Sequence, residues 1–217
     1  RLPLTIHTMA GGGRSMAAQH SQSLEAWFCH VPGLKVVMPS GAYEAKGLMV
    51  AAVRDDNPVI VVNQTALLGA SAPVPEDLYE IPLGVANIVR PGSNFTIVAL
   101  GAMVPEALKA AETLAEDGLD VEVIDPRTLQ PFDTGTVVAS VRKTHRALVA
   151  HEAVRFGGLG AEIAAQIQEE AFDHLDAPIR RVAGPDVPPM PFQHDMEAFF
   201  MPDRTKIAAA ARELAAY

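Results

Sequence analysis

The sequence contains a single cysteine, Cys29, among its 217 residues. One cysteine cannot form a disulfide within the chain, and its isolation indicates a reducing compartment. No apolar run approaches the roughly 20 residues that a membrane-spanning helix needs, so we expect no membrane segment. Positive charge is scarce as well, because 17 Lys and Arg stand against 26 Asp and Glu, with a formal net charge of -9. The Lys and Arg are scattered, which argues against a nucleic-acid-binding face.

Motifs for metal and phosphate binding are also missing. With one cysteine and no pair of histidines at the HxxxH spacing, the sequence offers no zinc site. The run Gly11-Gly12-Gly13 matches neither GxGxxG nor the P-loop, so we interpret it as a turn that admits positive φ and close packing. Arg14 is expected to face solvent, with an anionic substrate as the alternative. The opening RLPLTIHTMAGG resembles no signal or transit peptide and lacks an initiator Met, so we expect a fragment.

Apolar periodicity predicts alternating strands and helices over the first 63 residues. Runs at 4–9, 34–38 and 59–62 predict three strands, and the third is apolar throughout, as a buried parallel strand requires. Between the first two strands, apolar residues recur at the i, i+3, i+4 and i+7 spacing of an amphipathic helix. We expect its core-facing side to hold Leu24, Trp27, Phe28 and Val31.

Residues 64–92 hold several prolines and glycines without sustained periodicity, which predicts a linker over the surface. A second series of strands and helices follows, in which Asp133 is expected to cap a helix. Its strands are predicted at 95–100, 121–124, 147–150 and 179–182. The whole pattern favours an α/β fold with a mostly parallel sheet.

His20 lies in the loop after the first predicted strand. In open α/β sheets, ligands bind at the carboxyl ends of strands, on the loops that lead into helices. Imidazole, with a pKa of about 6.5, can donate and accept protons near neutrality. Because a loop histidine is more often an ordinary surface residue, the residues alone leave both interpretations open.

Several segments carry a family resemblance. They are, in order, QHSQSLEAWFCHVPGLKVVMPS, YEAKGLM, VRDDNPVIVV, YEIPLG, VEVIDPRTLQPFD, SVRKTHRALVAHEA, GGLGAEIAAQI and DAPIRRVAGPDVP. Together they resemble the β subunit of the E1 component of 2-oxo acid dehydrogenase complexes, thiamine diphosphate enzymes acting on pyruvate, branched-chain 2-oxo acids or acetoin. The resemblance covers essentially the whole chain. It implies the second half of a pyrimidine-binding domain (1–65), a linker (66–90) and a transketolase-like C-terminal domain (91–217).

The resemblance also implies an activity and its partners. The activity is oxidative decarboxylation of a 2-oxo acid with reductive acylation of a lipoyl-E2 component, and the sequence does not show which acid is used. Thiamine diphosphate and Mg²⁺ are shared with an E1 α subunit, so we assign no cofactor-binding residue in this chain and expect it to be inactive alone. The expected assembly is a heterotetramer of two α and two β chains docked on the E2 core. The compartment implied is the bacterial cytoplasm, or the mitochondrial matrix in a eukaryote.

Two sites follow from the resemblance. The histidine of the HSQ motif, His20, is assigned to substrate positioning and reductive acylation. A structural potassium site is implied where a helix ends, since carbonyls there lack helical partners; a helix terminus without an ion is the alternative. The potassium ligands implied are oxygens of Leu4, Ala52, Val53, Asp55 and Asn57.

Other interpretations stay open. The chain could be a non-catalytic module for β–β dimerisation and E2 docking. It could also be the C-terminal part of a single-chain transketolase-like enzyme, although the HSQ motif and the RDDNP turn speak against this. His151 and Glu152 end a predicted strand and could be taken for an acid–base pair. The family packs this region at subunit contacts, so we expect a packing role there.

Overall fold

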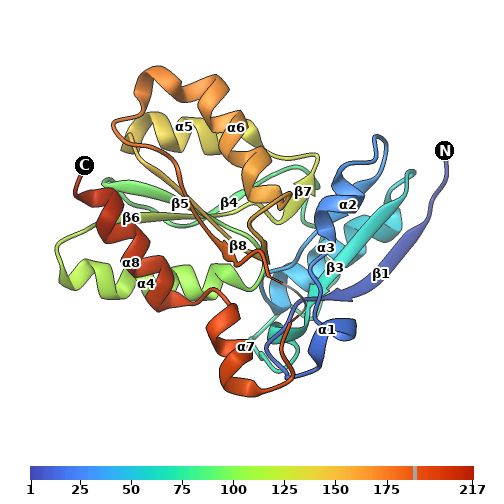
Figure 1. Cartoon of the computed structure of the whole chain (residues 1–217). Coiled ribbons are helices and arrows are strands. Elements are labelled where there is room, and N and C mark those ends of the chain that lie inside the picture. Colours follow the sequence, from blue (N-terminus) through green and yellow to red (C-terminus); the bar gives the residue numbers. More distant parts are fainter. Residues whose placement is uncertain (188–189) are drawn as a thin grey trace.

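The computed structural model describes residues 1–187 and 190–217, which fold into two sheets with covering helices (Figure 1). The first sheet has the strand order β1-β3-β2-β7. Its strands are β1 (Thr5–Ala10), β2 (Lys35–Val37), β3 (Val59–Gln64) and β7 (Thr128–Gln130). The three strands from the first 64 residues are parallel, as predicted, while β7 pairs antiparallel with β2. This sheet therefore takes its fourth strand from the second half of the chain.

The second sheet has the strand order β4-β6-β5-β8-β9. Its strands are β4 (Asn87–Arg90), β5 (Phe95–Ala99), β6 (Val121–Asp125), β8 (Ala147–Val154) and β9 (Arg180–Gly184). All pair in parallel except β4, which is antiparallel to β6 at the edge. β4 falls inside the predicted linker, which corrects that prediction. An edge strand with Ile88 43% exposed carries no apolar run that periodicity could detect.

Helices cover both faces of the second sheet, with α4 and α8 on one face and α5 and α6 on the other (Figure 1). No helix among the described residues is long and apolar enough to cross a membrane. The helices are α1 (Ala17–His20), α2 (Glu25–Cys29), α3 (Ala42–Arg54), α4 (Met103–Glu116), α5 (Thr134–Thr144), α6 (Leu159–Ala171), α7 (His194–Phe200) and α8 (Arg204–Ala215). Two short 3₁₀ turns complete the elements, at Thr65–Leu67 and Phe172–His174.

One cluster of buried side chains extends across both sheets. It contains Val36 and Ile60 of the first sheet together with Val98 and Val149 of the second. Close-packed apolar contacts of this kind resist displacement, because any gap loses dispersion and hydrophobic energy at once. The two sheets are therefore held in one orientation by shared core packing.

The predicted helix over residues 24–31 is shorter and turned differently from the expectation. Within this segment only the five-residue α2 forms, and the separate four-residue α1 ends four residues before residue 24. Trp27 is 69% exposed and Val31 is 46% exposed, so the prediction of both as core residues was wrong, while Phe28 packs against the core as expected. The inward face of α2 instead begins at Glu25, which is 2% exposed. A hydrophobic pattern cannot find such a face, because its buried residue is a glutamate.

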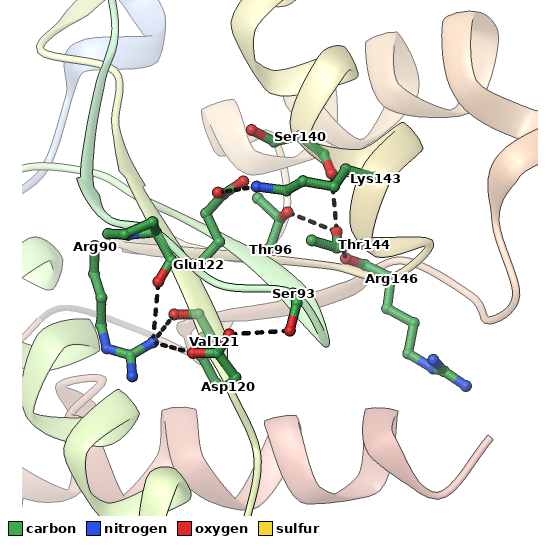
Figure 2. Close-up of polar contacts among 11 residues, drawn as sticks. Arg90, Ser93, Thr96, Asp120, Val121, Glu122, Ser140, Lys143, Thr144 and Arg146 are labelled. Carbon is green, nitrogen blue, oxygen red and sulfur yellow. Dashed lines mark hydrogen bonds and ion pairs between the residues drawn. The ribbon is translucent and has the colours of Figure 1, made fainter.

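A group of buried polar side chains connects α5 to the second sheet, which is called the C-terminal sheet below (Figure 2). Thr96 on β5 lies beside Glu122 on β6 in the strand register. The hydroxyl oxygens of Thr96 and Thr144 are 2.7 Å apart. The Glu122 carboxylate, whose side chain is 1% exposed, forms an ion pair with Lys143. All of these contacts join α5 to strands of the second sheet, so the network does not extend to the first sheet.

Candidate active site at the junction of the two sheets

The carboxyl ends of strands from both sheets meet at one junction. At the end of β3, the Gln64 side-chain amide donates a hydrogen bond to the Glu152 carboxylate of β8 at 3.0 Å. The Gln64 side-chain oxygen accepts the backbone N–H of Ala102, the residue before α4. After β1 ends, the N–H of Gly12 donates to the other oxygen of Glu152 at 2.5 Å. Such strand ends are where α/β sheets place their ligands. The first strand's loop is thus held by groups from the second sheet.

The glycine run is a turn with positive φ, as predicted. Gly11 has φ +82° and Gly13 has φ +92°. A Cβ on Gly11 would lie 2.6 Å from a Glu152 carboxylate oxygen, so close packing excludes a side chain there. Successive backbone N–H groups in such a turn attract anions. Here the anions are carboxylates of the chain itself, Glu152 and Glu197.

His20 is exposed at the end of α1 and lines a cavity of about 490 Å³. Arg14 lines the same cavity, and its Nε donates to the Thr65 carbonyl at 3.1 Å. Arg14 is exposed, as expected, and it lines the same cavity as His20. Among the described lining residues none carries a carboxylate; they are Met9, Arg14, Met16, Gln19, His20, Gln22, Leu24, Thr65 and Leu68.

This lining suits a small anion with an apolar portion. One guanidinium can bind a carboxylate through paired N–H donors, and one imidazole can transfer protons. Methionine and leucine side chains supply apolar walls. His20 is exposed and lines this cavity, but it is the last residue of α1, so its predicted position in a loop was wrong. Its assignment to substrate positioning and reductive acylation stays a prediction.

His151 and Glu152 are adjacent on β8 and have separate environments. Neighbouring strand residues point to opposite faces, so the two do not form an acid–base pair. Burial, with Arg181 and Arg155 nearby, lowers the pKa of His151 to about 4, and its ring fills the space beside Gly158 and Gly160. His151 thus has the packing role that was expected for both residues.

Glu152 has a different role from the expected one. Burial raises its pKa to about 7, and the carboxylates of Glu25 and Glu197 add to the rise, while the hydrogen bond from Gly12 opposes it. Its side chain belongs to the junction. Sequence reasoning missed both Glu152 and Glu197 as junction residues. The position of Glu152 near the end of a predicted strand could have indicated a site residue. No sequence pattern could have indicated Glu197, because its partners lie about 180 positions earlier in the chain.

The five implied potassium ligands lie around the end of α3, and several already have partners within the chain. The Leu4 carbonyl accepts the Val59 N–H at 2.9 Å, and the Ala52 carbonyl accepts the Thr5 hydroxyl at 3.0 Å. An ion would have to share these oxygens; the remaining implied ligands are Val53, Asp55 and Asn57.

The Asp55 carboxylate forms an ion pair with Lys35, which lowers its pKa, and it accepts two hydrogen bonds from Asn57. Among the described residues, no group of three or more His, Cys, Asp and Glu side chains is placed to hold a metal ion. Both alternatives, a potassium site and a helix terminus without an ion, stay predictions.

Comparison with known proteins places these observations in a family. The family model described as "Transketolase, pyrimidine binding domain" matches residues 1–70, and "Transketolase, C-terminal domain" matches residues 84–207. A pyruvate dehydrogenase E1 component subunit beta from Rickettsia felis is 45% identical over 217 residues, 100% of this chain and 66% of that protein. A 2-oxoisovalerate dehydrogenase subunit beta from Bacillus subtilis is 43% identical over 99% of this chain and 66% of its own length.

Two further relatives broaden the comparison. An acetoin:2,6-dichlorophenolindophenol oxidoreductase subunit beta from Cupriavidus necator is 46% identical over 97% of this chain and 62% of its own length. A solved structure titled split gene transketolase, inactive beta4 tetramer, superposes with a TM-score of 0.81 at 26% identity, over 98% of this chain and 66% of that chain. The chain thus spans 62% to 66% of the length of these three β-subunit relatives.

These findings confirm the predicted α/β fold with mostly parallel sheets and the family that the motifs indicated. The chain belongs to the transketolase-related family that includes the β subunits of 2-oxo acid dehydrogenase E1 components.

Proposed function

We propose that this chain contributes the β-subunit side of a thiamine diphosphate-dependent 2-oxo acid dehydrogenase active site. The observation that carries the proposal is the shared cavity of Arg14 and His20 at the carboxyl end of β1. A match to a pyrimidine-binding domain and relatives named for pyruvate, 2-oxoisovalerate and acetoin support it. The preferred 2-oxo acid is left open within this class.

The cavity's residues fit the substrate end of such a site. Arg14 provides the positive charge for a 2-oxo acid carboxylate, and the imidazole of His20 is placed to deliver or remove a proton during acyl transfer to lipoamide. Bound thiamine diphosphate would supply the carbanion-stabilising thiazolium, which no side chain can replace. We propose that an E1 α subunit holds the diphosphate and Mg²⁺, and that a second β chain and a lipoyl-E2 core complete the assembly.

The experiment is reconstitution of the full-length β chain with an α subunit, thiamine diphosphate, Mg²⁺ and a 2-oxo acid. Changing His20→Ala is expected to lower the rate of lipoyl-domain acylation by about 10²–10⁴-fold, the usual contribution of a positioned acid or base. Cofactor affinity, measured by calorimetry, should change little, because the role proposed for His20 concerns the substrate and the acyl group. His30→Ala is the matched control, since His30 is exposed and lies outside this cavity. Acylation by the His20 variant at the wild-type rate would remove the assignment.

An assembly-only role is the second candidate for the chain on its own. The structural neighbour is described as an inactive tetramer of β chains, which favours association without catalysis for an isolated chain of this fold. The reconstitution separates the two candidates, because an assembly module gives no turnover with any α subunit and 2-oxo acid.

A further inference from the structure

The loop between β1 and α1, together with the first residue of α1, contains two strained residues. Ser15 has φ +53° and Ala17 has φ +57°, in the left-handed region that residues with a Cβ rarely adopt. Strain of this kind persists only where the surroundings hold it, and it concentrates at functional sites. Arg14 precedes the first strained residue, and His20 follows three residues after the second. The loop's shape therefore determines where both cavity residues lie.

One carboxylate from the C-terminal domain holds this loop. Glu197 lies on α7, which Figure 1 shows beside α1, and it is 1% exposed. Its Oε1 accepts the N–H of Gly13 at 2.9 Å, and its Oε2 accepts the N–H of Ser15 at 2.8 Å. The Ser15 hydroxyl lies 3.4 Å from the same Oε2. The two oxygens thus bind the backbone on either side of Arg14.

The environment of Glu197 is unusual for a buried carboxylate. In the described part of the chain, no Lys, Arg or His side chain forms an ion pair with it. Backbone N–H donors of the loop compensate its charge instead, through charge-assisted hydrogen bonds. A buried charge without a cation is expensive to desolvate. Removing the carboxylate should therefore break both hydrogen bonds and release the loop.

We propose that Glu197 is a positioning residue, which holds the strained loop so that Arg14 and His20 face one cavity and the Arg14 guanidinium meets the carboxylate of a small anionic substrate. Arg14 is fixed at three points: the amides on its two sides and the bond from its Nε to the Thr65 carbonyl. The substrate part of this inference rests on the proposed function. The loop-holding part does not depend on it.

Amide hydrogen exchange tests the loop directly, in the full-length β chain without any substrate. In Glu197→Gln, one carboxylate oxygen becomes a donor, so one of the two loop amides loses its acceptor. Exchange at one or both of the Gly13 and Ser15 amides should rise by about 10-fold or more, the factor expected for one lost charge-assisted hydrogen bond. Glu112→Gln, on the exposed face of α4, is the matched control and should leave the loop unchanged. Wild-type exchange at both amides in the Glu197 variant would overturn the proposal.

Glu197→Asp is a second test variant, for the case that Glu197→Gln does not fold. It keeps the charge and removes one methylene, so the carboxylate no longer reaches both amides. Exchange at Gly13 and Ser15 should again rise, while amides of β5 and β8 keep wild-type protection. Equal loss of protection in these strands would mean that Glu197 supports the whole domain, which would overturn the positioning role.

The substrate part is tested in the reconstituted α/β enzyme by a double-mutant cycle. Glu197→Gln and Arg14→Met should each raise KM for the 2-oxo acid by about 10-fold, since each removes about one charged hydrogen bond from substrate recognition. The double variant should be no worse than Arg14→Met alone, because Glu197 acts through Arg14. Independent, multiplying effects would overturn the coupling. Altered exchange in an enzyme that turns over no 2-oxo acid would support the loop-holding role and reject the proposed function instead.

Discussion

Two regions of this molecule bury carboxylates in opposite ways. Within the C-terminal sheet, Glu122 lies under α5 and is compensated by the cation of Lys143 (Figure 2). At the junction of the sheets, Glu152 and Glu197 are compensated by backbone N–H groups of a loop that lies more than 100 residues earlier in the chain. The first arrangement fastens a helix to its own sheet. The second determines the shape of a loop that lines the cavity of Arg14 and His20. A buried carboxylate therefore indicates a functional position only when the groups that compensate its charge belong to a site.

The strongest test of the comparison is Gly11→Ala at the junction. The new methyl group would lie 2.6 Å from a Glu152 oxygen, at a φ of +82° that alanine resists. Because Gly12 and Gln64 hold that carboxylate, it cannot easily move aside. We expect a loss of about 3 kcal/mol in the free energy of unfolding, measured in urea, combining strain with overpacking.

Gly118→Ala is the matched control for this change. Gly118 has a similar φ of +79°, but no atom lies within 4 Å of the place that its new methyl group would take, so this variant isolates the backbone strain at about 1 kcal/mol. Equal losses of unfolding free energy in the two variants would show that the contact between the new methyl group and Glu152 does not add to the destabilisation. The comparison between the two regions would then fail.

Lys143→Met addresses the other region. The Lys143 side chain is 49% exposed, whereas that of Glu122 is 1% exposed, so the change leaves a buried carboxylate without its cation. We expect a loss of about 2 kcal/mol in urea unfolding, below the value for a fully buried pair because water reaches one partner. Adding Glu122→Gln should recover part of the loss. Exchange at Gly13 and Ser15 should stay at the wild-type rate, and a change there would erase the distinction between the regions.

The stability of the folded chain should depend on pH because of the junction carboxylate Glu152. The pKa of Glu152 is about 7 in the folded chain, against 4.5 for an ordinary glutamate, so the folded state binds a proton more tightly than the unfolded state does. Its stabilising contribution is therefore full below pH 4.5 and falls as the pH rises to about 7. The slope is at most about 1.4 kcal/mol per pH unit for one proton.

Variants can separate the sources of this slope. Burial also raises the pKa of Asp125 to about 7 and raises that of Glu25, and both groups add to the slope. Burial lowers the pKa of His151 to about 4, and this group opposes the slope because the folded state binds its proton less tightly than the unfolded state does. Glu152→Gln and Asp125→Asn should each flatten it, as measured by urea unfolding between pH 5 and 7. A slope unchanged in Glu152→Gln would mean that this carboxylate is not buried as described.

Local patterns predicted most of the strands and helices. The apolar run of β3 was readable because a strand buried on both faces needs apolar side chains throughout. Asp133 was readable as the cap of α5, and its side chain accepts the Thr136 N–H at 3.1 Å. Trp27 was assigned to the wrong face, since the inward side of α2 begins with the buried Glu25. β4 was missed because an edge strand can be held by backbone pairing, which leaves no side-chain pattern.

The sequence by itself determined the α/β order of elements, the positive-φ turn after β1 and the motif that singles out His20, because each depends on neighbouring residues. Only the tertiary structure decided that Glu152 and Glu197 hold that turn, that Arg14 shares the cavity of His20, and that β7 joins the first sheet. Hydrogen bonds between residues 140 and 184 positions apart leave no periodic trace, since they arise where strand ends from two sheets meet in space.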